Sequence, residues 1–248
     1  MGMAAAGGFF KALLQFIKWA KIVGPHVIDW LNQIRPQVRE WWHGKKIAII
    51  GPTAVGKNSF YLRLQGLPIP RKHINTKALE DVPKFKFRRV LPDGRKFEIK
   101  VNRSRNVGGE KEQRDRFWLD ACKEADVIFY MLSLKDLREG AYKDGNRVSE
   151  DLSWLGDQLG HMNGSPKVHF LINKVDVDLK VADDYDCFVE ELKPLLGEFE
   201  NAAKRALGPY SVRITGISPT SMSNDRIFNN SFTLVLESVY EATHRKHR

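Results

Sequence analysis

Residues 45–59 have the sequence KKIAIIGPTAVGKNS, in which an apolar run precedes a loop bounded by two glycines. Residues 45–51, which contain this apolar run after two lysines, have the length and the isoleucine content of a buried strand, and residues 57–65 have the pattern of a helix. A G-x-x-x-x-G-K match between a strand and a helix favours a phosphate-binding loop. Its glycines let backbone N–H groups turn towards phosphate oxygens, and the helix N-terminus adds partial positive charge. We therefore expect Lys57 to reach the terminal phosphates of a nucleotide.

The expected phosphate contacts come from Gly51, Thr53, Ala54, Val55, Gly56, Lys57, Asn58 and Ser59. One of these residues departs from the motif, because the position after the lysine normally holds Ser or Thr, whose hydroxyl oxygen binds Mg²⁺. An asparagine amide can bind a hard cation, but its oxygen would lie elsewhere relative to the octahedron that Mg²⁺ requires. We expect Asn58 to bind the metal weakly, and Ser59 to supply an oxygen only if the loop shifts by one residue.

A second motif follows the apolar run KVHFLIN at residues 167–173, which has the pattern of a buried strand. Residues 173–176 have the sequence NKVD, a match to the N-K-x-D pattern of GTP-binding proteins. A carboxylate at Asp176 accepts hydrogen bonds from guanine N1–H and from its 2-amino group, which adenine cannot offer. We expect Asn173 to tie this loop to the phosphate loop, and the aliphatic stem of Lys174 to cover the base. The motif therefore predicts selection of guanine.

Strand and helix patterns alternate from residue 45 onwards, which indicates an α/β fold with a mostly parallel sheet covered on both faces. Strands are expected at residues 45–51, 84–91, 95–101, 126–133, 167–173 and 211–217, and helices at residues 57–65, 110–124, 147–162, 184–206 and 224–243. The turn signal PDG at residues 92–94 joins the second and third strands in an antiparallel hairpin. We predict a three-layer P-loop NTPase domain, the G domain, over residues 45–248, with a six-stranded sheet.

Residues 106–110, NVGGE, lie between the hairpin and the next helix, and they resemble the D-V-G-G-Q segment of Arf-type proteins within the Ras-like family of small GTPases. In that family the aspartate holds Mg²⁺ through water, the second glycine senses the third phosphate through its N–H, and the glutamine orients the attacking water. The resemblance therefore implies a metal contact at Asn106, a phosphate contact at Gly109 and a catalytic position at Glu110.

The resemblance implies two further site residues. Thr76, in the loop before the first hairpin strand, matches the switch I threonine that contacts the metal and completes the catalytic set, with an ordinary loop threonine as the alternative. Ser218 stands where Ras-like proteins carry a short Ser-Ala loop whose backbone N–H meets the guanine oxygen, although Pro219 departs from that pattern.

The substitutions in these motifs disfavour ordinary catalysis. Asn58 and Asn106 remove two metal contacts, and Glu110 brings a carboxylate close to an anionic triphosphate. Because transfer of a terminal phosphate depends on charge neutralisation and water placement, the barrier to hydrolysis should rise by several kcal/mol. Two functions stay open: a GTP/GDP-dependent molecular switch with slow or impaired hydrolysis, and a pseudo-GTPase interaction module with a structural guanine nucleotide and no turnover. A different register, in which another acidic residue serves, also stays open.

Residues 1–44 are expected to form a separate amphipathic helical segment. Apolar residues recur at helical spacing over residues 9–23, Gly24-Pro25 ends that helix, and a second helical pattern continues over residues 27–41. Its tryptophans suit packing on the G domain or on a partner chain, and its apolar face with lysines opposite also suits a membrane interface. The interspersed lysines disfavour a signal peptide or a membrane span.

The chain of 248 residues has a net charge of +10, concentrated over residues 62–116, which hold 16 Lys or Arg against 7 Asp or Glu. This stretch fits an acidic protein, an anionic lipid surface, RNA or a solvated face, and no nucleic-acid motif supports RNA. Two cysteines without metal-ligand spacing indicate neither a disulfide framework nor a zinc site, so we expect a cytoplasmic protein, with peripheral membrane binding as the alternative. The expected ligands are GTP or GDP with weakly held Mg²⁺, and the expected partner is a protein effector at the switch loops, residues 70–80 and 106–116.

Overall fold

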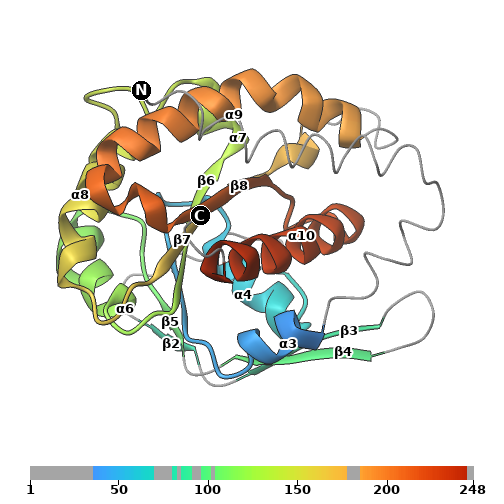
Figure 1. The fold of residues 1–248 in the computed structure, drawn as a ribbon. Coiled ribbons are helices and arrows are strands. Elements are labelled where there is room, and N and C mark those ends of the chain that lie inside the picture. Colours follow the sequence, from blue (N-terminus) through green and yellow to red (C-terminus); the bar gives the residue numbers. More distant parts are fainter. Residues whose placement is uncertain are drawn as a thin grey trace.

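The computed structural model describes residues 36–69, 80–82, 85–90, 96–101, 104–177 and 185–244 (Figure 1). In chain order, the elements of the first half are α3 (Pro36–Trp42), β1 (Ile47–Ile50), α4 (Lys57–Gln65), β2 (Glu80–Val82), β3 (Phe85–Val90), β4 (Lys96–Val101), β5 (Ser104–Asn106), α5 (Lys111–Gln113), the π-helix η1 (Arg114–Trp118), α6 (Leu119–Cys122) and β6 (Val127–Ser133). They are followed by α7 (Leu134–Arg138), α8 (Arg147–Gln158), β7 (Lys167–Asn173), α9 (Tyr185–Leu207), β8 (Ile214–Pro219) and α10 (Asp225–His244), with short 3-10 turns η2 (Leu159–His161), η3 (Val175–Val177) and η4 (Gly208–Arg213). The helices predicted within residues 1–35, and Thr76, lie outside the described residues.

The main sheet has the strand order β2-β5-β1-β6-β7-β8, and all neighbours run parallel except β2 and β5. Only four of the six predicted strands, β1, β6, β7 and β8, lie in this sheet, so the predicted six-stranded sheet is wrong in its composition. β3 and β4 form the predicted hairpin, but within the described part of the chain they make a separate two-stranded sheet. The remaining places belong to β2 and β5, whose three residues each are too few to show a periodic pattern.

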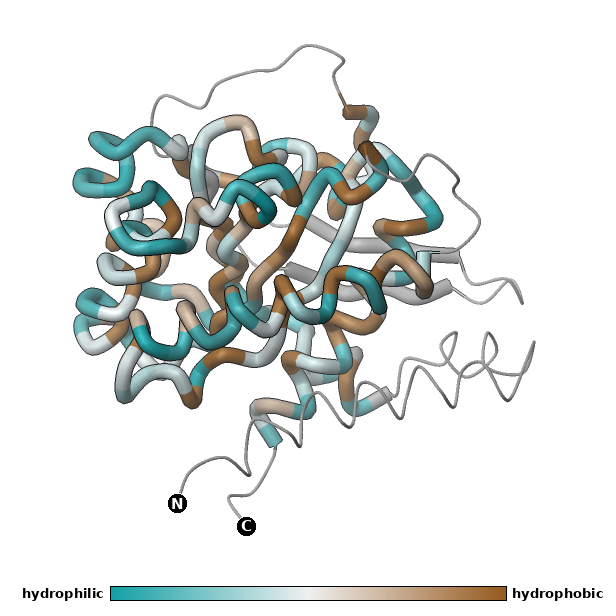
Figure 2. The backbone as a smooth tube through the Cα atoms, turned by 90° about the horizontal axis from the view of Figure 1, so that it is seen from above, coloured by the Kyte–Doolittle hydropathy of each residue, from teal (hydrophilic) through white to brown (hydrophobic). Residues whose placement is uncertain are grey.

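Alternate residues of the central strands face two cores on opposite sides of the sheet. Along β6, Ile128 and Tyr130 pack in a core that α6, α8 and α9 cover, whereas Val127 and Phe129 pack in a core that α3, α4 and α10 cover. All seven residues of β6 are buried as a result. Figure 2 shows hydrophobic residues running along the strands between the helical layers. Helices on both faces of a parallel sheet agree with the predicted α/β architecture.

Helix α3 packs beside α10, although it comes from the predicted N-terminal segment. Val38 and Trp42 are buried in the core of that face. The indole Nε1 of Trp42 donates a hydrogen bond to Leu236 O at 3.0 Å, and the ring stacks on Phe129 with centroids 6.4 Å apart. The contacts of this helix therefore continue across the predicted boundary at residue 44. The division of the chain into two parts stays a prediction, because residues 1–35 are not described.

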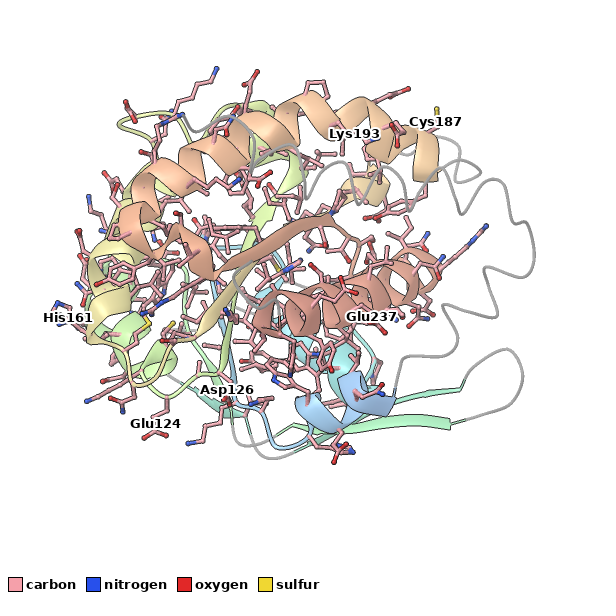
Figure 3. All side chains as sticks on the ribbon, viewed as in Figure 1. Glu124, Asp126, His161, Cys187, Lys193 and Glu237 are labelled. Carbon is pink, nitrogen blue, oxygen red and sulfur yellow. The ribbon has the colours of Figure 1, made fainter. Side chains whose placement is uncertain are left out.

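The helix predicted at residues 110–124 contains a π turn between α5 and α6, which places Arg114 and Trp118 in the interior. The short α7 was not predicted, and Ser133 caps it by accepting a hydrogen bond from Asp136 N. Among the described helices, none combines the length and the apolarity needed to cross a membrane. Both cysteines are free thiols, and Figure 3 places Cys187 at the outer end of α9.

Candidate nucleotide-binding site

Four loops meet at the carboxyl ends of the parallel strands. They are residues 51–56 after β1, residues 107–110 after β5, residues 174–177 after β7 and residues 220–224 after β8. In an open parallel sheet this edge is where ligands bind, because the loops and helix N-termini converge there. The two motifs predicted from the sequence, the phosphate loop and the NKVD segment, therefore lie on the same side of the molecule.

The phosphate loop has a backbone that only glycine accommodates at two positions. Gly51 has φ 136° and Gly56 has φ 103°. A Cβ at Gly51 would lie 2.0 Å from Met131 O, and a Cβ at Gly56 would lie 2.3 Å from Asn173 Nδ2. Ala54 adopts a positive φ of 62° without being glycine. The loop thus packs directly against the neighbouring strand and the NKVD segment, and its shape depends on both glycines.

Lys57 begins α4 and folds back over the phosphate loop. Its side chain is buried, and its Nζ donates hydrogen bonds to Gly51 O at 2.8 Å and to Pro52 O at 2.7 Å. Burial lowers the pKa of Lys57 from 10.5 to about 7, against the opposing effect of the Asp151 carboxylate. A phosphate next to this ammonium would replace the lost solvation, so the site is built to receive an anion.

Asn173 connects three of the four loops. It ends β7, it is buried, and its Nδ2 donates a hydrogen bond to Val55 O at 2.7 Å. Its Oδ1 accepts a hydrogen bond from Met222 N at 3.0 Å. The next residue, Lys174, is exposed and has a positive φ of 65°, which turns the chain sharply after the strand. The tie between the NKVD segment and the phosphate loop, which the sequence predicts, is therefore present in the structure.

Asp176 has one carboxylate oxygen that is engaged and one that is not. Its Oδ2 accepts a hydrogen bond from Ser223 Oγ at 2.5 Å. Its Oδ1 is buried and has no hydrogen-bond partner among the described residues. A buried carboxylate oxygen left unpaired costs about 1–3 kcal/mol or more. A ligand that presents an N–H group to this oxygen, as the edge of guanine does, would remove that cost, so the residues fit a guanine base.

Ser218 does not join this cluster. Its Oγ contacts His169 Nε2 at 2.9 Å, within the sheet, because β8 continues to Pro219 rather than ending at residue 217 as predicted. The loop beside Asn173 starts two residues later: Thr220 N donates a hydrogen bond to Ile172 O at 2.7 Å. Sequence reasoning therefore missed residues 220–223, and the error of two residues in the strand end is the cause.

The segment at residues 107–110 lies directly on the phosphate loop. A Cβ at Gly109 would lie 2.3 Å from both Pro52 C and Thr53 N, so the two backbones are in close contact. Glu110 is exposed, and its Oε1 accepts a hydrogen bond from Thr53 Oγ1 at 2.9 Å. The structure therefore brings Gly109 and Glu110 to the phosphate loop, and Asn106 is the last residue of β5, beside Ile49 of β1.

The set of residues predicted to hold Mg²⁺ is less complete in the structure than the set predicted to hold the phosphates and the base. Asn58 and Ser59 lie in the first turn of α4, and Thr76 is outside the described residues. In the described ranges, no three or more His, Cys, Asp or Glu side chains are grouped so that they could hold a metal ion. P-loop proteins hold Mg²⁺ with a Ser or Thr and an Asp, together with phosphate oxygens. The described donors thus fit the phosphates better than the metal, and the metal contacts stay predictions.

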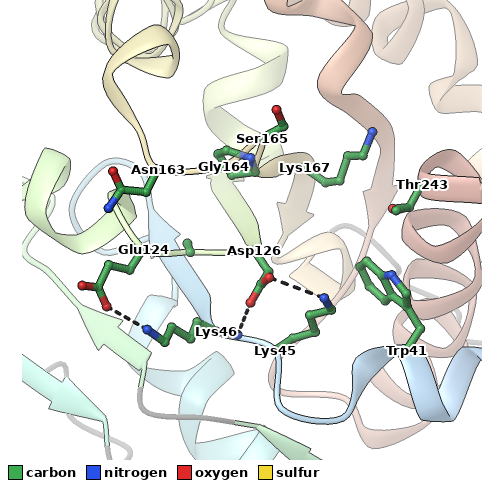
Figure 4. A pocket seen from close by; sticks show the side chains of 12 residues that line it. Trp41, Lys45, Lys46, Glu124, Asp126, Asn163, Gly164, Ser165, Lys167 and Thr243 are labelled. Carbon is green, nitrogen blue, oxygen red and sulfur yellow. Dashed lines mark hydrogen bonds and ion pairs between the residues drawn. The ribbon is translucent and has the colours of Figure 1, made fainter.

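A further pocket lies at the opposite edge of the sheet, where β1, β6 and β7 begin (Figure 4). It has a volume of about 490 Å³, and Trp41 forms one wall. Two of the three lysines that line it are paired: Lys45 Nζ lies 3.4 Å from Asp126 Oδ1, and Lys46 Nζ lies 2.8 Å from Glu124 Oε2. The two carboxylates offset most of the positive charge in this pocket, and the pocket lies at the opposite ends of the strands from the loops described above.

No family model matches this chain. The chain is similar to the protein named GTPase Der from a Nitratiruptor species, with 27% identity over 172 residues. The similarity covers 66% of this chain and 33% of that protein, so this chain corresponds to about a third of the length of its relative. The similarity and the fold both fit a P-loop GTPase G domain.

Proposed function

We propose that this chain binds guanine nucleotides, GTP and GDP, at the edge formed by the four loops. The observation that carries this proposal is the unpaired buried Oδ1 of Asp176, in a segment that Asn173 ties to the phosphate loop. The base would supply N–H groups to Asp176 while its phosphates meet the backbone of residues 51–56 and Lys57. The partial similarity to GTPase Der supports the same ligand class.

We also propose that this chain hydrolyses GTP slowly or not at all. Thr53 Oγ1 donates its hydrogen bond to Glu110, so this carboxylate is engaged where the Ras-like pattern has a water-orienting glutamine. The carboxylate also adds negative charge beside a triphosphate, and Asn58 replaces the hydroxyl that binds Mg²⁺. Each change opposes the charge neutralisation on which phosphoryl transfer depends.

Two functional classes follow from nucleotide binding. As a molecular switch, the chain would alter its loops at residues 70–80 and 106–116 when the third phosphate is present, and so change a surface for a protein effector. As a pseudo-GTPase, it would keep the nucleotide as a structural ligand of an interaction module. The close packing of Gly109 on the phosphate loop favours the second class, because that contact is made between protein groups alone.

Calorimetry with GDP, GTP and ATP tests the ligand class. We expect binding of GDP and GTP and no competition by ATP. In Asp176→Asn the amide can donate to a carbonyl at position 2 of the purine, which xanthine has and guanine lacks, so we expect weaker GDP binding and a gain of XDP binding. Absence of heat with GDP and GTP in the unaltered protein, or equal competition by ATP, would defeat the proposal.

Single-turnover hydrolysis and the Mg²⁺ dependence of affinity test the proposed impairment of hydrolysis. We expect no hydrolysis beyond a slow background in the unaltered protein, and a steeper Mg²⁺ dependence of GTP affinity in Asn58→Ser. The double variant Asn58→Ser, Glu110→Gln should gain measurable turnover if these two positions account for the loss. Fast turnover in the unaltered protein would contradict the proposed impairment.

The partner of residues 1–44 is proposed to be a protein surface rather than a membrane. The burial of Val38 and Trp42 against the G domain supports protein packing for the end of this segment. Liposome flotation of the full chain, with a variant lacking residues 1–35 as the control, distinguishes the two. Flotation that depends on residues 1–35 would favour peripheral membrane association instead.

A further inference from the structure

A buried ionic cluster lies beneath the loop at residues 107–110. Asp151 of α8 is fully buried and its carboxylate is the centre of the cluster. Arg114 Nη1 donates to Asp151 Oδ1 at 3.0 Å, and Tyr130 OH donates to Asp151 Oδ2 at 3.0 Å. Arg147 Nε lies 2.9 Å and 3.1 Å from the two carboxylate oxygens. Such a cluster has a defined geometry, because removing one partner leaves an uncompensated buried charge.

Two side chains above this cluster hold consecutive carbonyl groups of the loop. Arg147 Nη2 donates to Gly109 O at 3.0 Å, and Trp118 Nε1 donates to Gly108 O at 2.9 Å. The guanidinium of Arg147 also lies over the Trp118 ring, 5.9 Å from its centroid. Arg147 therefore joins three parts of the protein at once: the buried carboxylate, the indole and the loop backbone.

These contacts orient the loop N–H groups as well as its carbonyls. In a trans peptide the C=O and the following N–H point in opposite directions. With Gly108 O held by Trp118, the N–H of Gly109 points away from Trp118, and with Gly109 O held by Arg147, the N–H of Glu110 points away from Arg147. Gly109 itself lies against Pro52 and Thr53 of the phosphate loop. The loop is thus fixed by protein groups that need no nucleotide.

We propose that Arg147 is a positioning residue that keeps residues 107–110 in the arrangement that receives a third phosphate, whichever nucleotide is bound. This inference rests on the proposed function, and it concerns how the same site treats GTP and GDP. In a switch whose loop is ordered by the third phosphate, part of the binding free energy of GTP is spent on ordering the loop. Here Arg147 and Asp151 hold the loop beforehand, so the triphosphate gains its contacts without that cost and the loop changes little between the two nucleotide states.

The test compares the affinities of GDP and of a non-hydrolysable GTP analogue in Arg147→Gln. We expect the analogue to bind about tenfold more weakly than in the unaltered protein, and GDP to bind within about twofold of it. Arg213→Gln is the matched control, because Arg213 Nη1 also donates to a backbone carbonyl, Leu159 O at 2.9 Å, and lies 4.8 Å from an aromatic ring centroid. The control should change neither affinity.

A purely structural role for Arg147 would lower both affinities equally, and that result would overturn the inference while leaving guanine nucleotide binding intact. Failure of GDP and GTP to bind the unaltered protein would instead defeat the proposed function. If Arg147→Gln does not fold, hydrogen exchange of the unaltered protein decides: apart from the Gly109 amide, which the third phosphate itself would contact, we expect the amides of residues 107–111 to be equally protected with GDP and with the GTP analogue. Protection that appears only with the analogue would overturn the inference.

Discussion

The pKa values of two buried residues, Lys57 and His169, are lowered, which favours their neutral forms. In both cases the cause is burial. Lys57 lies in the site, whereas His169 lies within the sheet between hydroxyl groups of β8. Their consequences therefore differ: the first changes ligand binding and the second changes stability.

Nucleotide binding should take up a proton at alkaline pH. The pKa of Lys57 is about 7 in the absence of a ligand contact, and adjacent phosphate charge raises it. At pH 8.5 the amine is mostly neutral before binding and becomes charged on binding, whereas at pH 6 it is already charged. Calorimetry at pH 8.5 in two buffers of different ionisation enthalpy should therefore give heats that depend on the buffer, in the direction of proton uptake. Heats that do not depend on the buffer at pH 8.5 would contradict this.

His169 should make the fold acid-sensitive. Thr215 Oγ1 donates to Val168 O at 3.2 Å, so it accepts from His169 Nδ1–H, and Nε2 accepts from Ser218 Oγ. Burial lowers the pKa of His169 from 6.5 to about 3. The unfolded chain therefore binds more protons than the native state between these values, and stability falls as the pH decreases through that window.

From pH 6.5 to pH 5 this single group should lower the free energy of unfolding by about 2 kcal/mol. In His169→Gln the loss of stability over that pH range should be smaller by nearly that amount, since glutamine does not titrate, and the slope of stability against pH should be correspondingly shallower. Urea denaturation at several pH values gives both slopes. Equal slopes in the two proteins would show that His169 is not the cause.

At the scale of elements, the phosphate loop depends on close packing as well as on glycine conformation. The loop lies between β6 and the end of β7, and Gly51 has no room for a side chain. Gly66, which ends α4, also has a positive φ, of 71°, but among the described residues, its two chain neighbours aside, no atom lies within 4 Å of a Cβ built there. A substitution at Gly66 therefore introduces backbone strain alone, whereas one at Gly51 adds a steric clash.

Gly51→Ala should destabilise the protein by about 3 kcal/mol or more, because its Cβ would meet a backbone carbonyl that cannot rotate away. Gly66→Ala should cost about 1 kcal/mol, from conformational strain alone. Chemical denaturation of both variants measures the difference. Similar losses in the two variants would mean that the close approach to Met131 O has no energetic consequence.

At the scale of the whole molecule, the core extends beyond the predicted domain boundary. Trp42 lies in the same core as the phenylalanines of β6 and α10, so α3 belongs to the packed unit. Trp41, the neighbouring residue, is only half-buried and packs on Tyr240. Trp42 is therefore the more deeply buried of the two adjacent tryptophans.

Trp42→Ala should destabilise the protein by about 4 kcal/mol, through lost burial, the cavity that remains and the lost hydrogen bond to Leu236 O. Trp41→Ala is the matched control and should cost much less. A chain that starts at residue 45 should be destabilised at least as much as Trp42→Ala, and a chain that starts at residue 36 should keep this contribution. Thermal or urea denaturation of the four proteins tests the prediction, and equal stability of the two shortened chains would contradict it.

Local spacing in the sequence predicts the phosphate loop, the NKVD segment, the hairpin and most helices, because each depends on residues that are neighbours in the chain. The motif predicts the hydrogen bond from Asn173 to Val55 of the phosphate loop. It does not predict the second hydrogen bond of this side chain, which Met222 N donates. Predicting that second bond requires knowing where β8 ends, which depends on pairing with β7 rather than on the strand's own pattern.

The choice of strands in the sheet, and the cluster that holds the loop at residues 107–110, depend on contacts between residues that are distant in the sequence. β2 and β5 are too short to have a periodic signal, so their place follows from pairing with distant strands. Arg147 and Gly109 are 38 residues apart, and their contact exists because α8 packs on the sheet that contains β5, the strand before Gly109. Interactions of this kind arise from how elements pack, and no regular spacing in the chain encodes them.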